Sequence, residues 1–258
     1  MAAEPYPVPL LRFVDGSQKP PALSSSTPLR LLTDADFPPF SFGGGDGAMA
    51  GLSADLAREA CREINTSCEI IPRPWGELTG ALEKGEGDAI VAGPKLDPAI
   101  ARRFLTTRPY FRAMARFAVR SETPLQAADI RVLAGKRVAT VKASAHADWL
   151  KRHFPQSAII EFDTSLAAYE ALRTGGVDAV FDDAFRLIFW KNGSASRGCC
   201  KLLPGAFLEE ETISPVLGII VRADREDLRQ AFDYGLDRAQ TSGAFAGIFR
   251  RYVPESPW

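Results

Sequence analysis

The chain lacks the features that mark several large classes of protein. It has 258 residues, a formal net charge of −1 and only two histidines, His146 and His153, in one predicted helix. Balanced charge argues against a broad nucleic-acid-binding surface, because such surfaces concentrate Lys and Arg. The two histidines have no Cys or carboxylate at ligand spacing, so no metal site is expected. His146 could contact a ligand, but we expect it to be exposed to solvent.

Signatures of membrane spans and of common enzymes are also missing. No apolar run is long enough to cross a bilayer. No Gly-x-Ser-x-Gly elbow, phosphate-binding loop or dinucleotide fingerprint occurs. No charged segment followed by an apolar run precedes the first strand, so we expect that any secretion signal has been removed. Residues 1–28 are rich in Pro and Ser and predict an extended arm anchored by Leu10, Leu11 and Phe13.

One segment of the sequence occurs twice. Residues 81–91 are echoed at 171–181, with Ala, Leu, Gly, Asp and Ala at matching positions. In each copy a helix ends at a glycine that can adopt the left-handed conformation, and an aspartate precedes a short apolar strand. Two like units indicate two lobes, and a cleft between lobes is where a small ligand would bind. The alternative is one large α/β sheet with a chance similarity.

Alternating strand and helix patterns predict a largely parallel sheet in each half, with right-handed crossovers. The first half has strands at 30–33, 68–71 and 88–91, with helices at 53–64, capped by Ser53, and at 75–84. The second half has strands at 137–141, 157–162 and 178–181, with helices opened by Ser144 and by Thr164 or Ser165. A strand at 218–222 and a helix at 225–242 are expected to return the chain to the first lobe. The loops after Thr33, Val91, Val141 and Phe181 should face the cleft.

A series of short motifs occurs in order along the chain. They are Thr33-Asp-Ala-Asp-Phe-Pro-Pro-Phe40, Gly51-Leu-Ser-Ala-Asp-Leu56, Gly85-x-x-Asp-Ala89, Pro109-Tyr110, Leu133-Ala-Gly-Lys136 and Gly243-Ala-Phe-Ala-Gly-Ile-Phe249. Together they resemble the type 3 periplasmic solute-binding proteins, which deliver polar amino acids and related solutes to ABC importers.

The resemblance implies a two-lobed periplasmic binding protein fold of type II, an α/β fold hinged by two crossing segments. Lobe I would comprise 29–113 and 215–258, and lobe II would comprise 114–214, each a mostly parallel sheet flanked by helices. The protein would be a periplasmic monomer that closes on a small solute and docks on the membrane subunits of an ABC transporter, with no cofactor. An enzyme of the cyclohexadienyl dehydratase kind, or the sensing domain of a receptor, is the alternative.

The cysteines follow the same resemblance. The lysine/arginine/ornithine and histidine binders carry a disulfide with the spacing of Cys61 and Cys68, which implies that bond here and an oxidising compartment. Two buried reduced thiols are the alternative. The adjacent Cys199 and Cys200 could form a vicinal disulfide, stay free or pair elsewhere.

The resemblance also implies a set of ligand-binding residues. Phe37 and Trp75 would cover the ligand side chain, and aromatic faces attract cations. Asp183 would receive the ligand α-amino group, and Asp34 would meet a basic side chain. The remaining binding positions are Gly93, Lys95, Ser144 and Ala145. Phe37 could instead be a core aromatic, and Asp34 or Asp36 could simply cap a turn, a role that we favour for Asp36.

The chain departs from the family pattern where amino-acid binders hold the ligand carboxylate. Ile100 stands where those binders have a clamping arginine, and Lys95 replaces a Ser or Thr. Ala143-Ser144-Ala145 replaces the usual Gly-Ser-Thr loop, whose backbone N–H groups can still bind an anion. These changes leave a modified amino acid, an opine-like conjugate, an amine or another carboxylate solute as candidates.

Overall fold

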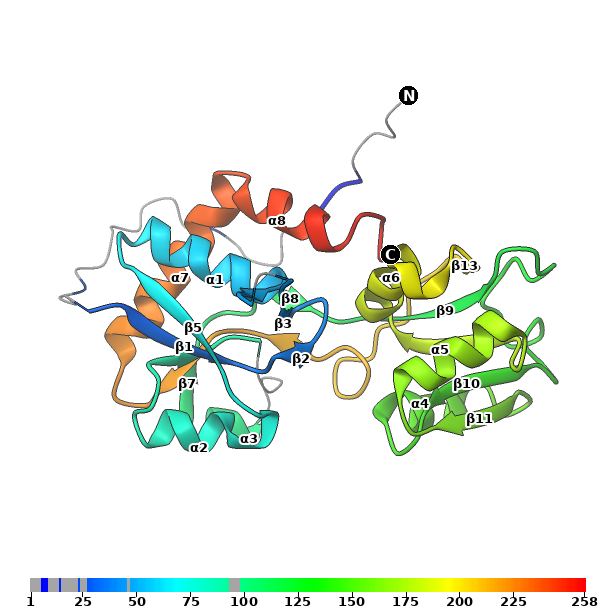
Figure 1. Ribbon diagram of the computed structural model, residues 1–258. Helices are drawn as coiled ribbons and strands as arrows, with labels where there is room; N and C mark the ends of the chain where they lie inside the picture. The colour runs from blue at the N-terminus through cyan, green and yellow to red at the C-terminus, as the bar shows by residue number, and fades with distance from the viewer. Residues whose placement is uncertain (1–5, 9–13, 15–22, 24–26, 46, 93–97) are drawn as a thin grey trace, which may run out of the picture. The chain divides into compact units, whose positions relative to one another are not determined.

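The computed structural model describes residues 6–8, 14, 23, 27–45, 47–92 and 98–258 (Figure 1). The described residues form two compact units. Unit 1 contains the residues up to Arg112 together with Val216–Tyr252, and unit 2 contains Ala113–Pro215 together with Val253–Trp258. The last six residues therefore belong with unit 2, whereas from the sequence we assigned them to lobe I. The expected anchors Leu10, Leu11 and Phe13 lie outside the described residues.

Unit 1 is built on a five-stranded sheet with the order β5-β1-β6-β15-β7. Its strands are β1 (Leu29–Thr33), β2 (Asp36–Phe37), β3 (Ser41–Gly43), β4 (Met49–Ala50), β5 (Cys68–Pro72), β6 (Ala89–Ile90), β7 (Phe104–Thr106), β8 (Phe111–Arg112), β14 (Val216–Leu217) and β15 (Ile220–Arg222). Its helices are α1 (Leu52–Glu63), the 3₁₀ turn η1 (Trp75–Glu77), α2 (Leu78–Glu83), α3 (Pro98–Ala101), α7 (Glu226–Thr241) and α8 (Ala244–Tyr252).

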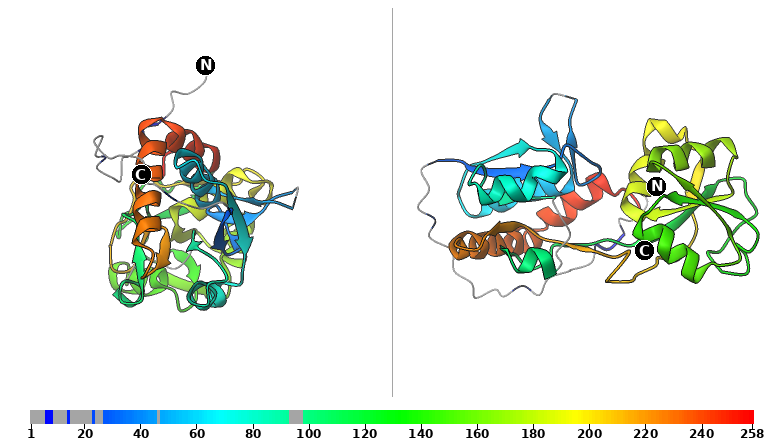
Figure 2. Two further views of the ribbon diagram at one scale, coloured as in Figure 1. Left: turned by 90° about the vertical axis from the view of Figure 1, so that its left-hand side faces the viewer. Right: turned by 90° about the horizontal axis from the view of Figure 1, so that it is seen from below.

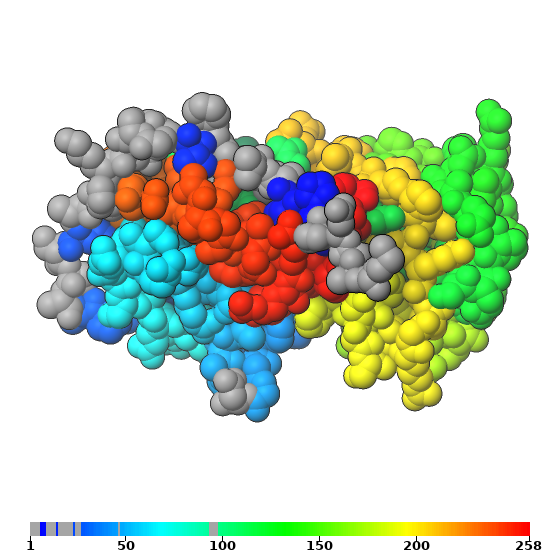
Figure 3. Space-filling model, turned by 90° about the horizontal axis from the view of Figure 1, so that it is seen from above, coloured from blue at the N-terminus to red at the C-terminus, as the bar shows by residue number. Residues whose placement is uncertain are grey.

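Helices cover both faces of the unit 1 sheet (Figures 1 and 2). On one face, Leu78 and Leu82 of α2 pack with Leu32, Ile90 and Ile220 of the strands, all fully buried. Helices α1, α7 and α8 contact one another, and Figure 3 shows them side by side on the surface. The buried face of α1, with Leu52, Leu56, Ala57 and Ala60, therefore packs within unit 1.

Unit 2 repeats this plan with the strand order β11-β10-β12-β9-β13. Its strands are β9 (Ala115–Arg120), β10 (Arg137–Val141), β11 (Ala158–Phe162), β12 (Ala179–Asp183) and β13 (Cys200–Leu202). Its helices are α4 (Ala145–His153), α5 (Ser165–Thr174), α6 (Ala184–Asn192) and the 3₁₀ turn η2 (Ser194–Ser196).

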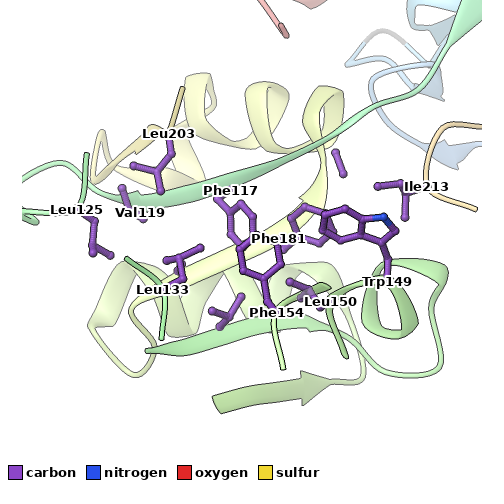
Figure 4. Packing of buried hydrophobic residues seen from close by; sticks show 13 residues of the cluster. Phe117, Val119, Leu125, Leu133, Trp149, Leu150, Phe154, Phe181, Leu203 and Ile213 are labelled. Atoms are coloured by element: carbon purple, nitrogen blue, oxygen red, sulfur yellow. The ribbon is translucent and has the colours of Figure 1, made fainter. Parts of the chain in front are cut away.

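Side chains alternate between the two faces of the unit 2 sheet, as the period of a strand requires. Phe117 of β9 and Phe181 of β12 point to the α4 face, where Trp149 stacks on Phe181 with ring centroids 4.9 Å apart (Figure 4). Their neighbours Ala118 and Val180 point to the opposite face, against α5 and α6. Both faces are apolar, because helices cover both.

One strand in each five-stranded sheet runs against the others. In unit 1 this is β15, antiparallel to β6 and β7, and in unit 2 it is β9, antiparallel to β12 and β13. Each reversed strand follows shortly after the chain enters its unit from the other one. The prediction of mostly parallel sheets is confirmed, but the sequence pattern did not identify these reversals.

The repeat seen in the sequence is also a repeat in structure. Gly85 and Gly175 both have left-handed backbones, with φ of 73° and 83°. Asp88 accepts a hydrogen bond from the backbone N–H of Arg30, and Asp178 accepts one from that of Arg137, both at 2.8 Å. Each aspartate therefore joins the entry of its own strand to the start of the neighbouring strand.

Two local predictions about helix starts had different outcomes. Ser144 caps α4 and accepts a hydrogen bond from the backbone N–H of Ala147. Ser53 does not cap α1, which begins after Gly51; its buried hydroxyl accepts a hydrogen bond from Tyr110 instead. Gly51 has φ of 125° and lies so close to the carbonyl of Phe40 that any side chain there would clash.

Both cysteine pairs form disulfides. Cys61 at the end of α1 is bonded to Cys68 at the start of β5, which confirms the bond implied by the resemblance. Cys199 and Cys200 form a vicinal disulfide, one of the three states that the sequence left open.

Candidate functional site

The carboxyl end of β12 in unit 2 carries two adjacent buried carboxylates, Asp182 and Asp183. Asp183 also caps α6, because its Oδ1 accepts hydrogen bonds from the backbone N–H groups of Phe185 at 2.9 Å and Arg186 at 3.1 Å. Its Oδ2 has no hydrogen-bond partner in the part of the chain that the structure describes. One oxygen is thus held by the helix start, and the other is open to a further donor.

Burial governs the titration of Asp183. It raises the pKa of this carboxyl to about 6, against the opposing effect of the Arg186 guanidinium. Because ionising Asp183 is costly in the free protein, a cation beside it would stabilise its charged form strongly.

Asp182 is held more firmly in its charged form. Tyr169 donates its hydroxyl proton to Asp182 at 2.6 Å, and Arg186 donates to it at 2.8 Å. Although burial raises the pKa of Asp182, Arg186 and the nearby His146 outweigh this and lower it below the ordinary value. The cluster therefore contains two carboxylates and a single arginine.

His146 is not exposed to solvent, contrary to our expectation. Its side chain is 13% exposed, and its Nδ1 lies 4.0 Å from Asp182 Oδ1. Burial lowers the pKa of its imidazole, although Asp182 opposes the effect. Its Nε2 is buried without a hydrogen-bond partner among the described residues. This nitrogen is a second open hydrogen-bonding atom in the cluster.

The loop before α4 lies at the end of β10, the strand next to β12. Ser144 donates its hydroxyl proton to the carbonyl of Val141 at 2.6 Å and accepts a hydrogen bond from the backbone N–H of Ala147, so its one donor is used within the loop. Ala145 is exposed, and Ala143 has a left-handed backbone with φ of 54°. A left-handed alanine costs about 1 kcal/mol or more, and such strain clusters at binding loops.

In unit 1, Asp34 follows β1 and Phe37 and Trp75 form an aromatic pair. The ring centroids of Phe37 and Trp75 are 5.4 Å apart in an edge-to-face arrangement, and Phe37 also stacks on Phe40. Trp75 is 45% exposed, which is unusual for so large an apolar side chain. Phe37 is half-buried, so it packs on its neighbours and is still partly open to solvent.

Asp34 is the aspartate that caps a turn. Its Oδ1 accepts a hydrogen bond from the backbone N–H of Asp36 at 2.6 Å, whereas we had favoured Asp36 for this role. Oδ1 of Asp34 is thus committed to the loop.

Of the positions that depart from the family pattern, some lie outside the residues that the structure describes. Gly93 and Lys95 are outside the described residues. Ile100 is buried in the α2-side core with Leu32 and Phe104, so no charge is present at that position. Arg103 forms an ion pair with Glu83 at 2.7 Å on the surface.

The sequence did not identify Asp182, Arg186, Tyr169 and His146 as one cluster. The spacing of Asp182 and Arg186, four residues apart at a strand-to-helix junction, was a usable signal for an ion pair. Tyr169 gave no such signal in the sequence, because its hydrogen bond to Asp182 joins α5 to β12. No group of three or more metal-ligating side chains occurs among the described residues.

The model of the bacterial extracellular solute-binding proteins, family 3, matches residues 29–255. The chain belongs to this family. It is 22% identical over 232 residues to the ABC transporter arginine-binding protein 1 of Escherichia coli, covering 90% of this chain and 93% of that protein. It is 24% identical over 234 residues to the histidine-binding periplasmic protein of Salmonella typhimurium, covering 87% and 86%.

Solved structures place the fold in the same group. The open form of substrate-binding domain 2 of Lactococcus lactis GlnP superposes with a TM-score of 0.81 at 17% identity, covering 92% of this chain and all of that one. The chain is thus a solute-binding protein, and the relatives are named for binding and not for a reaction. No helix in the described part of this family 3 protein is both long and apolar enough to span a membrane.

Proposed function

We propose that this protein binds a small amine-bearing solute outside the cytoplasm and delivers it to the membrane subunits of an ABC importer. The observation that carries the proposal is the acidic end of β12, where Asp182 and Asp183 are buried beside the single guanidinium of Arg186. A protonated amine would complete the charge balance of this cluster.

Asp183 is the group that we assign to the amine. Its Oδ2 is open, and its pKa of about 6 means that ionisation is opposed by burial. An amine donating to Oδ2 would replace the water that burial removes from the carboxylate. Charge-assisted hydrogen bonds of this kind contribute about 1.5–3 kcal/mol each. The affinity of the solute would therefore depend strongly on the charge of this one side chain.

Phe37 and Trp75 are assigned to the carbon body of the solute. An exposed indole beside a half-buried phenyl ring offers flat apolar surface, and ring faces also attract cations by about 0.5–2 kcal/mol. Because these rings belong to unit 1 and Asp183 to unit 2, the proposal requires the two units to close on the solute. Closure would be favoured by contacts that both units make only in the closed form.

Ile100 bears on which solutes are candidates. It is packed among core side chains where other amino-acid binders place a carboxylate-clamping arginine, so bidentate recognition of an α-carboxylate at that position is not available. Modified amino acids, opine-like conjugates and simple amines are therefore as plausible as ordinary cationic amino acids as the proposed solute. The relatives named for arginine and histidine support the basic amino acids as the first compounds to test.

Titration calorimetry against cationic amino acids, opines, polyamines and betaines tests the proposal. Asp183→Asn keeps an acceptor for the start of α6 but removes the charge, and Asp163→Asn is the matched control at an exposed loop position. We expect Asp183→Asn to weaken binding by about tenfold or more, and the control to leave it unchanged. An unchanged affinity in Asp183→Asn would remove the assigned amine site.

A further inference from the structure

Unit 2 has a hollow that the proposed solute site does not use. It has a volume of about 450 Å³ and lies between β9, α6, β13 and the C-terminal segment, whose end Figure 1 shows beside α6. Its walls carry the charged residues Arg116, Lys191, Lys201 and Glu255 and the apolar side chains of Leu202 and Trp258. A volume of this size suits a small organic molecule.

Arg116 is the unusual residue of this hollow, because it is a buried charge that forms no ion pair among the described residues. Burial lowers its pKa, and Glu255 opposes this only from beyond ion-pair distance. Arg116 is 7% exposed, and its guanidinium donates only to two neutral carbonyls, those of Leu203 and Ser256. Its Nε is buried with no partner among the described residues. Asp182 lies directly opposite in the β9–β12 register, but forms its ion pair with Arg186 instead.

The other charges of the hollow do not balance Arg116. Glu255 is the carboxylate on the wall, and its Oε1 is already bonded to Lys191 at 2.8 Å and to the side chain of Asn192 at 2.9 Å. Lys201 has no carboxylate within ion-pair distance in the described parts of the chain. The side chains of the hollow therefore carry three positive charges, on Arg116, Lys191 and Lys201, and one negative charge, on Glu255.

A buried charge that lacks a counter-ion is costly, and a bound anion removes that cost. We propose that this hollow binds a small organic carboxylate, with the carboxylate beside Arg116 and Lys201 and the apolar body on Leu202 and Trp258. Arg116 uses two of its five N–H groups on carbonyls, so donors remain for the anion. The volume and the apolar wall favour an anion with a carbon body over a bare phosphate.

Phenylacetate is a suitable probe, and phenylacetamide is its neutral counterpart. Titration followed by the indole N–H resonance of Trp258, assigned with Trp258→Phe, reports on the hollow itself. We expect phenylacetate to shift this resonance and to bind at least about tenfold more tightly than phenylacetamide. Lys201→Glu should weaken phenylacetate binding at least about tenfold, whereas Lys136→Glu, at an exposed site elsewhere on unit 2, should not.

Arg116→Gln tests the buried charge directly, and near-ultraviolet circular dichroism shows whether that variant is folded. If it does not fold, Lys201→Glu carries the test alone, because Lys201 is only half-buried. Equal binding of phenylacetate and phenylacetamide, or equal effects of the two Lys→Glu changes, would overturn the proposal. So would the absence of any shift of Trp258 with millimolar phenylacetate, since Arg116 would then serve only to hold the C-terminal segment.

Discussion

The free protein should become more stable when Asp183, the proposed amine-binding carboxylate, is neutralised. Burial raises the pKa of Asp183 from its ordinary value of 3.8 to about 6. Because a tenfold change in proton affinity corresponds to about 1.4 kcal/mol, ionised Asp183 costs the folded state about 3 kcal/mol at pH 7.5. Because Asn still accepts hydrogen bonds at the start of α6, Asp183→Asn should raise the free energy of unfolding by about 1–3 kcal/mol at that pH.

The pH dependence of this gain is the sharper test. As the pH falls through 6, folded Asp183 takes up a proton and its cost diminishes. Near pH 4, where about half of the unfolded carboxyls are also protonated, less than about 1 kcal/mol of the cost remains. Urea unfolding of the wild type, Asp183→Asn and Asp163→Asn at pH 7.5 and pH 4 measures the difference. A destabilised Asp183→Asn at pH 7.5, or a gain of equal size at both pH values, would refute the reasoning.

Three further outcomes are expected. Amine binding should weaken about tenfold between pH 7 and pH 5, as Asp183 is protonated below a pKa of about 6, and calorimetry should find this slope absent from Asp183→Asn. Phe117→Ala should cost about 3–5 kcal/mol in urea unfolding, because the ring is fully buried between other rings, whereas Leu166→Ala, an exposed position, should cost little. Gly235→Ala should lower the melting temperature, since its added methyl would lie 2.5 Å from a carbonyl oxygen of α1; Gly247→Ala, in open space on α8, should raise it slightly.

Much of the fold could be predicted from the sequence, because its signals are local. Gly85 and Gly175 end helices in left-handed conformations, and Ser144 caps α4, as residue type and position indicated. The errors came from contacts between distant segments. Ser53 has the chemistry of a helix cap, but its hydroxyl lies within reach of Tyr110, fifty-seven residues away, and is buried there.

In the candidate site, too, two expectations from the sequence were wrong. Sequence resemblance selected Asp183, Phe37 and Trp75. The turn-capping role that we favoured for Asp36 belongs to Asp34, and His146 is only 13% exposed instead of open to solvent. The turn contact of Asp34 spans only two residues, so it had a local signal that we weighed wrongly. The burial of the His146 imidazole had no such signal, because it depends on the neighbours that packing brings.

The sequence by itself determined the duplicated strand-and-helix plan and the family, because apolar periodicity, capping residues and glycines act over a few residues. Tertiary structure alone decided the reversed strands β9 and β15, the titration of Asp183 and the burial of Arg116 without an ion pair among the described residues. The physical reason is that burial and charge pairing are properties of surroundings: a side chain acquires them only when distant strands and helices exclude water around it.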